Sequence, residues 1–320
     1  MILCYRPVRA LKDQPHWLLP HLKQMGWQVQ ERDDGPVVES SDDILWVLDN
    51  ANWFPRICSG LMKMEAQARP FTIIWHTEPL PPSRISEIAL PKLSFKEIVK
   101  IILNDRRATD VYTNNKRLES LHRHSIPDLL MVSSEGRKEF LTERGLSAHY
   151  LPMGYSQHVH DHYEGDPKDI DVLFLGDHSV PRRKKFLGLL QKKSVPLLVK
   201  GSWHDPGCWG ENRKKLLNRS KILLNIHRYP GDLTGYRLLQ GMANQALVIS
   251  EPIYKPAPYI PDMHYVSVSV EEMADAIRYY LNNNEERMKI VNAGYRLVTK
   301  ELTIENTLKR VFRLVNNQDD

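Results

Sequence analysis

One pattern dominates this chain of 320 residues: short apolar runs alternate with amphipathic segments of helical spacing. The apolar runs are rich in β-branched and aromatic residues, which favour strands. Strands that alternate with helices are typical of parallel βαβ units. The pattern fills residues 1–154 and begins again at residue 170, so it predicts two consecutive Rossmann-like α/β domains.

In the first half we expect strands at residues 2–5, 27–31, 44–48, 71–75, 110–113, 129–133 and 148–151. The helices between them are expected at 15–25, 55–68, 95–103, 116–124 and 134–144. In the second half the strands are expected at 171–176, 196–200, 222–226, 246–250 and 265–268. The helices there are expected at 181–193, 211–218, 235–244, 270–281, 285–300 and 304–315, and the last three form a helical C-terminal tail.

The stretch 155–169 breaks this pattern, because it is polar and has no apolar period. We interpret it as an interdomain linker. The expected organisation is therefore a first domain at 1–154, the linker, a second domain at 170–300 and a C-terminal helix at 301–320. His158, His160 and His162 alternate within the linker, and histidines are metal ligands. No strand pattern brings them together, so a solvated linker is the favoured interpretation.

The composition, 42% hydrophobic and 26% charged, is that of a globular protein with buried cores. The three cysteines, Cys4, Cys58 and Cys208, form neither a disulfide framework nor a metal-ligand spacing. The sequence has no apolar stretch near the about 20 residues that a spanning helix needs. Arg6 and Arg9 stand where a signal peptide needs its apolar region. We therefore expect a cytoplasmic protein.

The formal net charge is +5, and much of it lies in the basic runs 182–185 and 213–215. Such runs have three interpretations: solvated helix faces, sites for anionic ligands such as nucleotide diphosphates, and peripheral attachment to an anionic membrane surface. A nucleic-acid partner is not expected, because no helix-turn-helix, zinc or aromatic-basic signature accompanies the charge.

Ligands of open parallel sheets bind beyond the carboxyl ends of the strands, so function is expected in the strand-to-helix loops. The first such loop of the second half begins at Gly176, which allows a tight turn, and Pro181 suits the first turn of the helix. Arg182 and Arg183 then stand near a helix N-terminus, where free N–H groups favour anions. A phosphate at this position and a solvated basic turn are the two interpretations.

The second loop contains Lys200, Gly201 and Trp203. Its glycine and tryptophan offer backbone groups and a flat aromatic wall to a nucleobase, while a buried Trp203 that anchors the loop is the alternative. The third loop, residues 226–235, follows a buried strand and contains an adjacent His and Arg. Thr234 is expected to cap the next helix, so that backbone N–H groups remain for a diphosphate.

Arg237 lies one turn into this helix, and Gln240 lies three residues further on the same face. A guanidinium suits a phosphate and an amide suits ribose hydroxyls. From Arg237 through Gln240 to the apolar strand at 246–250, the segment resembles the donor-site helix of group 1, retaining, GT-B glycosyltransferases. The similarity is to their short variant, which includes spore-maturation-type proteins. It extends to the stretches DVLFLGD, LLNIHR and the C-terminal helices at 271–303.

The resemblance implies a GT-B fold, in which two Rossmann-like domains face a cleft and a helical tail follows. It implies retaining transfer of a sugar from a nucleotide diphosphate sugar to an acceptor that the sequence does not identify, without a metal or other cofactor. The donor-binding residues that we expect are Gly176, Arg182, Arg183, Lys200, Gly201, Trp203, His227, Arg228, Thr234, Gly235, Tyr236, Arg237 and Gln240.

The chain also departs from the family. Many group 1 enzymes have two glutamates eight positions apart, where this chain has Asp232 and Gln240. Asn244 and Gln245 stand where a glycine is usual. These departures favour a second hypothesis, a catalytically degenerate glycosyltransferase-fold protein that binds a nucleotide, a glycan or a protein partner. Another GT-B-like enzyme, such as a sugar-nucleotide epimerase, is a third.

On the acceptor side, His76 and Glu78 follow the fourth expected strand and are predicted to be catalytic. A histidine beside a carboxylate positions or deprotonates an acceptor hydroxyl. The alternative is that His76 only caps the strand and Glu78 is solvated. Asp49, Asn50 and Asn52 form a second acceptor-side candidate, with loop structure as the favoured explanation.

Overall fold

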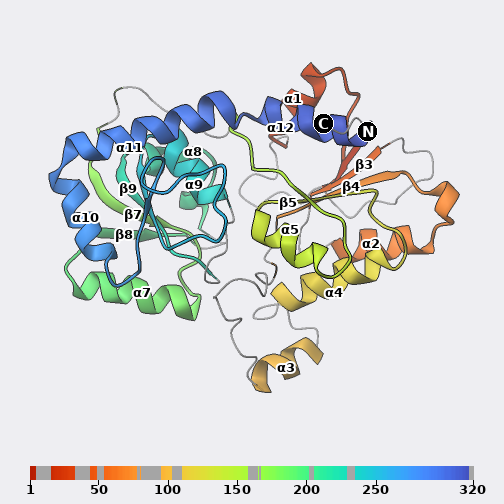
Figure 1. Cartoon of the computed structure of the whole chain (residues 1–320), viewed down its shortest axis with the longest axis horizontal. Helices are drawn as coiled ribbons and strands as arrows, with labels where there is room; N and C mark the ends of the chain where they lie inside the picture. The colour runs from red at the N-terminus through yellow and green to blue at the C-terminus, as the bar shows by residue number, and fades with distance from the viewer. Residues whose placement is uncertain are drawn as a thin grey trace. The chain divides into compact units, whose positions relative to one another are not determined.

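The computed structural model describes residues 1–4, 16–32, 44–48, 54–77, 80, 95–102, 110–157, 165, 167–201, 205–228 and 235–316. The chain divides into two compact units (Figure 1). The first unit holds most of the chain up to Leu151 together with the residues from Val311 on, and the second holds Pro152–Arg310.

The first unit contains a six-stranded parallel sheet with the strand order β2-β1-β3-β4-β5-β6. Its strands are β1 (Ile2–Cys4), β2 (Gln30–Arg32), β3 (Ile44–Leu48), β4 (Phe71–His76), β5 (Leu129–Val132) and β6 (His149–Tyr150). Its helices are α1 (Leu19–Gln24), α2 (Phe54–Lys63), a 3-10 turn (Ala66–Ala68), α3 (Phe95–Ile102), α4 (Asp110–His122) and α5 (Glu135–Thr142).

Alternate side chains of these strands enter two different layers, as the pleat of a strand requires. Leu45, Val47 and Ile74 pack in one core cluster with α2, α4 and α5. Trp46 and Trp75, on the opposite face, lie 6.2 Å apart between ring centroids. The ring of Phe312, from the last helix, stands edge-on to Trp46 at 6.3 Å. This contact explains why the end of the chain belongs to the first unit.

The second unit contains a five-stranded parallel sheet with the order β11-β10-β9-β7-β8. Its strands are β7 (Ile170–Leu175), β8 (Leu197–Lys200), β9 (Ser220–Asn225), β10 (Leu247–Ser250) and β11 (Val266–Ser267). Its helices are α7 (Pro181–Lys192), a 3-10 turn (Pro206–Cys208), α8 (Gly210–Asn218), α9 (Tyr236–Ala243), α10 (Met273–Asn282), α11 (Asn284–Arg296) and a π-helical turn (Leu297–Glu301). Helix α12 (Ile304–Val315) begins in the second unit, and its residues from Val311 on belong to the first.

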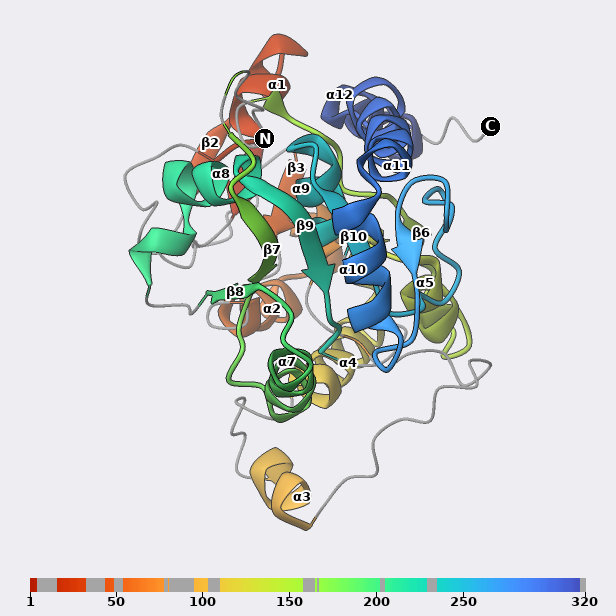
Figure 2. The same ribbon diagram turned by 90° about the vertical axis from the view of Figure 1, so that its left-hand side faces the viewer.

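Helices cover both faces of this second sheet, which faces the viewer in Figure 2. Helices α7, α10 and part of α11 pack on the face that contains Val172 and Phe174. Helices α8 and α9 pack on the other face, which contains Leu173 and Val248. Both faces of β7, β9 and β10 are buried, which accounts for the continuous apolar runs that predicted them.

The strand order creates a topological switch point between β7 and β9. The chain moves outward from β7 to β8 and then returns to place β9 on the other side of β7. The loops that leave the carboxyl ends of β7 and β9 therefore diverge to opposite faces of the sheet. This divergence is where open parallel sheets bind ligands.

One predicted strand is wrong. Residues 110–113 form the first turn of α4 and not a strand. This run is rich in β-branched and aromatic residues, but so short a run does not distinguish a strand from a buried helical segment. Leu118 and Leu121 continue the helical spacing and pack in the core of the first unit, so tertiary packing decides in favour of the helix.

The segment that follows the first unit is held against the start of α12. The backbone N–H of Tyr155 donates to the carbonyl of Leu302 at 2.7 Å, and the N–H of Ile304 donates to the carbonyl of Tyr155 at 2.8 Å. A Cβ atom at Gly154 would lie 2.4 Å from the Cα of Ile304. The two segments therefore approach each other so closely that position 154 requires a glycine. The histidines 158, 160 and 162 lie outside the described residues.

No helix among the described parts of the chain is long and apolar enough to cross a membrane.

Candidate functional site

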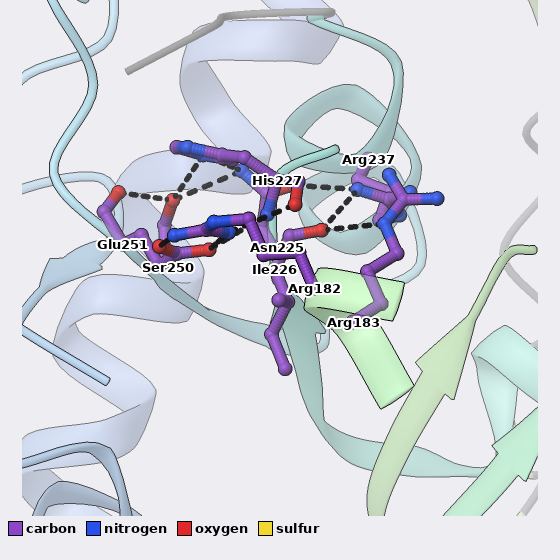
Figure 3. A network of polar contacts seen from close by, with 8 residues as sticks. All are labelled: Arg182, Arg183, Asn225, Ile226, His227, Arg237, Ser250 and Glu251. Atoms are coloured by element: carbon purple, nitrogen blue, oxygen red, sulfur yellow. Dashed lines mark hydrogen bonds and ion pairs between the residues drawn. The ribbon is translucent and has the colours of Figure 1, made fainter. Parts of the chain in front are cut away.

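Arg237, on the first turn of α9, reaches the carboxyl ends of both strands at the switch point (Figure 3). Its Nε donates to the carbonyl of Leu175 at 3.1 Å, at the end of β7. Its Nη1 donates to the side-chain oxygen of Asn225, the last residue of β9, at 2.9 Å, and lies 3.4 Å from the carbonyl of Ile226. One guanidinium therefore ties together the two strands where a ligand is expected.

Arg183, on the first turn of α7, approaches the same point from the other face. Its Nε donates to the carbonyl of Ile226 at 3.0 Å. The ring of Phe174 lies below both cations, with the guanidinium carbon of Arg183 at 5.8 Å and that of Arg237 at 5.4 Å from its centroid. Two guanidiniums thus share one carbonyl and one aromatic ring, and they concentrate positive charge at the switch point.

The side chain of Arg183 is almost completely buried, with 6% of its surface exposed. Burial, together with the nearby charge of Arg228, lowers the pKa of Arg183 to about 10. The group stays protonated at neutral pH. Arg183 forms no ion pair with a carboxylate of the described residues. Asp177, whose carbonyl accepts from Arg183 Nη1 at 3.1 Å, contributes only a longer-range attraction.

Arg182 differs from Arg183 because its guanidinium is paired with a carboxylate, that of Glu251. Its Nη1 donates to Glu251 Oε1 at 2.8 Å and to the carbonyl of His227 at 2.9 Å, and its Nη2 pairs with Glu251 Oε2. The backbone N–H of His227 donates to Glu251 Oε1 at 2.8 Å. Burial by itself raises the pKa of Glu251, but the hydrogen bonds and charge of Arg182 and the His227 N–H hold it below its usual value. The pair fixes the loop after β9 to the start of α7.

The imidazole of His227 is buried beside the ends of β9 and β10. Its Nε2 lies 3.1 Å from the side-chain nitrogen of Asn225 and 3.4 Å from the hydroxyl of Ser250. The same Asn225 nitrogen donates to Ser250 Oγ at 2.9 Å. An amide nitrogen only donates, so Nε2 is the acceptor in the contact with Asn225. The ring orientation is therefore set by its neighbours.

Two glycines allow the loops after β7 and β8 to approach each other closely. The N–H of Gly176 donates to the carbonyl of Lys200 at 2.9 Å. Gly201 has a φ of 117°, and a Cβ atom there would lie 2.6 Å from the nitrogen of Gly176. A Cβ atom at Gly176 would lie 3.0 Å from Arg237 Nη2. The glycines therefore keep side chains out of the space next to Arg237.

Helix α9 begins after Gly235, which has a φ of 72°. The hydroxyl of Tyr236 accepts from Arg213 Nη1 at 3.1 Å. Gln240 lies one turn further and is 4% exposed. Its Nε2 has no hydrogen-bond partner among the described residues. A buried amide without a partner is costly, by about 1–3 kcal/mol, and is uncommon in stable folds.

Helix α9 ends in a Schellman motif. The N–H of Gln245 donates to the carbonyl of Met242 at 3.1 Å, and the N–H of Ala246 donates to the carbonyl of Gly241 at 2.9 Å. The motif needs a left-handed residue, and Gln245 adopts a φ of 51°. The position where the family usually has a glycine is therefore a true left-handed position in this chain.

The structure brings together a group of the residues that the sequence singled out: Gly176, Arg182, Arg183, Lys200, Gly201, His227, Arg228 and Arg237. Gly235, Tyr236 and Gln240 share helix α9 or its start with Arg237. Trp203 and Thr234 lie outside the described residues, as do Asp49, Asn50, Asn52 and Asp232. Among the residues that the structure describes, no group of three or more His, Cys, Asp or Glu side chains is arranged to hold a metal ion.

His76 belongs to the first unit, where it is the last residue of β4 and not part of the loop after it. Its side chain is fully buried. Glu78 lies outside the described residues. Arg137, from α5, is also buried and donates to the carbonyl of Thr77 at 2.9 Å and to Ser133 Oγ at 2.8 Å. It thus fixes the backbone directly after His76 at the carboxyl edge of the first sheet.

Sequence reasoning missed Asn225, Ser250, Glu251 and Arg137. A usable signal existed for the first three, because each is a polar residue at the end of an apolar strand, where a parallel sheet gathers its functional groups. Arg137 had no such signal, because a single arginine near the start of an amphipathic helix is ordinary.

Comparison with known proteins identifies the fold. The family model described as glycosyl transferase-like matches residues 182–313. A comparison with curated proteins finds no significant match. HepE from Anabaena, crystallised in complex with UDP and glucose, is similar at a TM-score of 0.65 and 8% identity, over 99% of each chain.

Two further solved structures are similar. WaaG, a glycosyltransferase involved in lipopolysaccharide biosynthesis, has a TM-score of 0.52 at 13% identity, over 97% of this chain and 98% of WaaG. TarM has a TM-score of 0.55 at 14% identity over 93% of this chain, which spans 57% of the length of TarM. The two parallel-sheet units and the helical C-terminus agree with these neighbours. The chain therefore has the GT-B fold of glycosyltransferases, and its residues 182–313 match the glycosyl transferase-like family.

Proposed function

We propose that this chain transfers a sugar from a nucleotide diphosphate sugar to an acceptor, and that its second unit binds the donor. The single observation that carries the proposal is the position of Arg237, which joins the ends of β7 and β9 at the switch point. Because HepE was crystallised with UDP and glucose and with UDP-glucose, UDP-sugars are the first donors to test.

In this proposal the diphosphate lies against Arg183, Arg228 and Arg237, whose charges stabilise the negative charge that develops on the leaving group. Gly176 and Gly201 let backbone groups approach the phosphates closely. Arg182 has a different part, because Glu251 already balances its charge. Its part is to position the loop that contains His227.

Gln240 is proposed to bind the ribose hydroxyls. Its buried Nε2 has no partner among the described residues, and a diol supplies both an acceptor and a donor for an amide. Lys200, Trp203, Thr234, Gly235 and Tyr236 complete the proposed donor side. In the first unit, His76 and Glu78 are proposed to orient the acceptor hydroxyl. By resemblance we propose retention of configuration and no metal or other cofactor. The cytoplasmic location stays a proposal from the sequence.

The test is the release of nucleoside diphosphate from a panel of nucleotide sugars, since a transferase without its acceptor slowly uses water. The wild type is expected to release UDP or another diphosphate from at least one donor. Arg237→Met is expected to lower this rate about 100-fold or more, the usual effect of removing one group that stabilises a developing charge.

The matched control is Arg219→Met. Arg219 directly precedes β9 and therefore lies at the opposite edge of the same sheet, paired with Asp169. This variant is expected to keep the wild-type rate. If the wild type binds a nucleotide but releases none from any donor, the degenerate binding protein becomes the better description. If Arg219→Met loses as much activity as Arg237→Met, the effect is general damage to the sheet.

A further inference from the structure

Asn225, the last residue of β9, holds Arg237 with a neutral side chain. Its oxygen accepts from Arg237 Nη1 at 2.9 Å, and the residue is 3% exposed (Figure 3). The Nε of the same guanidinium donates to the carbonyl of Leu175. The third nitrogen, Nη2, faces Gly176, where a Cβ atom would lie 3.0 Å from it. Asn225 and Leu175 thus fix the plane of the guanidinium and orient its Nη2 toward the loop after β7.

The other end of the Asn225 amide determines its orientation. The amide nitrogen donates to Ser250 Oγ at 2.9 Å and lies 3.1 Å from His227 Nε2. Ser250 Oγ donates its own proton to the carbonyl of Glu251 at 2.7 Å, so it accepts from Asn225. A reversed amide would place its NH₂ group against the N–H groups of Arg237, where neither partner accepts. The network therefore keeps the amide oxygen toward the cation.

Arg182, the neighbouring cation, is held by a charged group instead. Its partner is the carboxylate of Glu251, which directly follows β10 as Asn225 ends β9. A carboxylate orients a guanidinium and also cancels much of its charge. An amide orients the guanidinium and leaves its charge available to an anion. The two strand ends therefore give Arg182 and Arg237 different electrostatic properties.

We infer that Asn225 is a positioning residue of the donor site: its neutral amide orients Arg237 toward the diphosphate and leaves the charge of Arg237 uncancelled. The inference rests on the proposed function, because the diphosphate of the donor is the anion that Arg237 meets. It predicts that a carboxylate of the same shape at position 225 keeps the hydrogen bond to Arg237 and still weakens diphosphate binding.

The probe is inorganic pyrophosphate, which has the diphosphate chemistry without a base or a sugar, titrated into the full chain in a calorimeter. Asn225→Asp is expected to bind it at least about tenfold more weakly than the wild type, because the new carboxylate opposes an anion beside Arg237. The thermal midpoint of this variant without ligand is expected to stay close to that of the wild type, since the carboxylate still accepts from Arg237. A merely structural residue would lower affinity and thermal midpoint together.

A second variant, Asn225→Leu, keeps the charge of Arg237 and removes its hydrogen bond to position 225. It is expected to bind pyrophosphate about tenfold more weakly, the order of one hydrogen bond to a charged group. In an Arg237→Met background it is expected to cause no further loss, because Asn225 acts through Arg237. This neutral variant decides the question if Asn225→Asp does not fold.

The matched control is Asn292→Asp, which makes the same change of charge at an exposed position of α11 in the same unit. It is expected to bind pyrophosphate like the wild type. The inference is overturned if a folded Asn225 variant binds like the wild type, if the control loses as much as Asn225→Asp, or if Asn225→Leu loses as much without Arg237 as with it. A wild type that binds no pyrophosphate overturns it too. Failure of the proposed function gives a different result, in which pyrophosphate binding depends on Asn225 but no nucleotide sugar releases its diphosphate.

Discussion

Replacing Glu251 by Gln removes the charge that holds Arg182 and the loop after β9. The carboxylate accepts two hydrogen bonds from Arg182 and one from the backbone of His227. Hydrogen bonds to charged groups contribute about 1.5–3 kcal/mol each, and they are not additive. The Glu251 side chain is 7% exposed but that of Arg182 is 24% exposed. After the substitution, water therefore partly solvates the Arg182 cation, which has lost its carboxylate partner. We expect Glu251→Gln to lower the free energy of unfolding by about 2–3 kcal/mol.

The second change is Arg182→Met in the Glu251→Gln background. Removing the cation as well leaves no uncompensated charge, so the double variant is expected to recover about 1–2 kcal/mol relative to the sum of the single changes. The control is Asp169→Asn. Asp169 forms a bidentate pair with Arg219 of similar geometry, but both side chains are about half exposed. Its unfolding free energy is expected to stay close to that of the wild type, because exposed pairs contribute little.

The assay is urea denaturation of the full chain, repeated as the pH is lowered. The pKa of Glu251 is below its usual value in the folded protein. Its stabilising contribution is therefore complete above the unfolded pKa, about 4.3 for Glu, and is lost as the pH falls through the lower folded pKa. The difference between wild type and Glu251→Gln should be full at neutral pH and shrink below about pH 4. A difference under about 0.5 kcal/mol at neutral pH, or one that does not change with pH, would refute this account of the pair.

Three further predictions concern stability. Gln245→Gly is expected to raise the free energy of unfolding by about 0.5–1 kcal/mol in urea denaturation, because the residue has a φ of 51°; a loss would contradict this. Burial lowers the pKa of Lys168 from 10.5 to about 8, so the penalty for its buried charge is present below pH 8 and is relieved as the pH rises toward 10.5. The wild type should gain thermal stability over Lys168→Met between about pH 7 and about pH 9.5, and a constant difference would rule the reasoning out. Phe312→Ala is expected to cost about 3 kcal/mol, because the ring stacks on Trp27 at 4.7 Å and contacts Trp46; a change below about 1 kcal/mol would show that α12 is not part of the first core.

The α/β class was predictable, because buried parallel strands leave continuous apolar runs in the sequence. The GT-B fold was expected from the resemblance of the second half to a known family. The run at 171–176 is β7 with a one-residue shift at each end, and the last helix has the predicted bounds Ile304–Val315. The order of the strands was not predictable from periodicity, since a run of apolar residues does not state which strand pairs with which. The switch point between β7 and β9 therefore came from the structure.

The candidate site was predictable for residues that stand near the start of a helix directly after a strand. Arg183 and Arg237 stand near helix starts that follow strands, and the structure brings both to one carbonyl, that of Ile226. Glu251 could have been singled out by its position directly after the apolar strand at 246–250, but its partner could not, because the pairing with Arg182 spans 69 positions of sequence. The same reasoning failed to foresee that Arg182 has its charge balanced within the protein.

The most direct test of the central claim is amide hydrogen exchange of the full chain with and without the nucleoside diphosphate that most raises its thermal midpoint. At a hundredfold excess over the dissociation constant, a bound ligand stabilises the folded state by about 2.7 kcal/mol, which slows exchange from the bound region about 100-fold. The account predicts this protection at residues 176–183, 226–228 and 235–240, around Arg183 and Arg237. Protection confined to the first unit, or no protection with any nucleoside diphosphate, would contradict it.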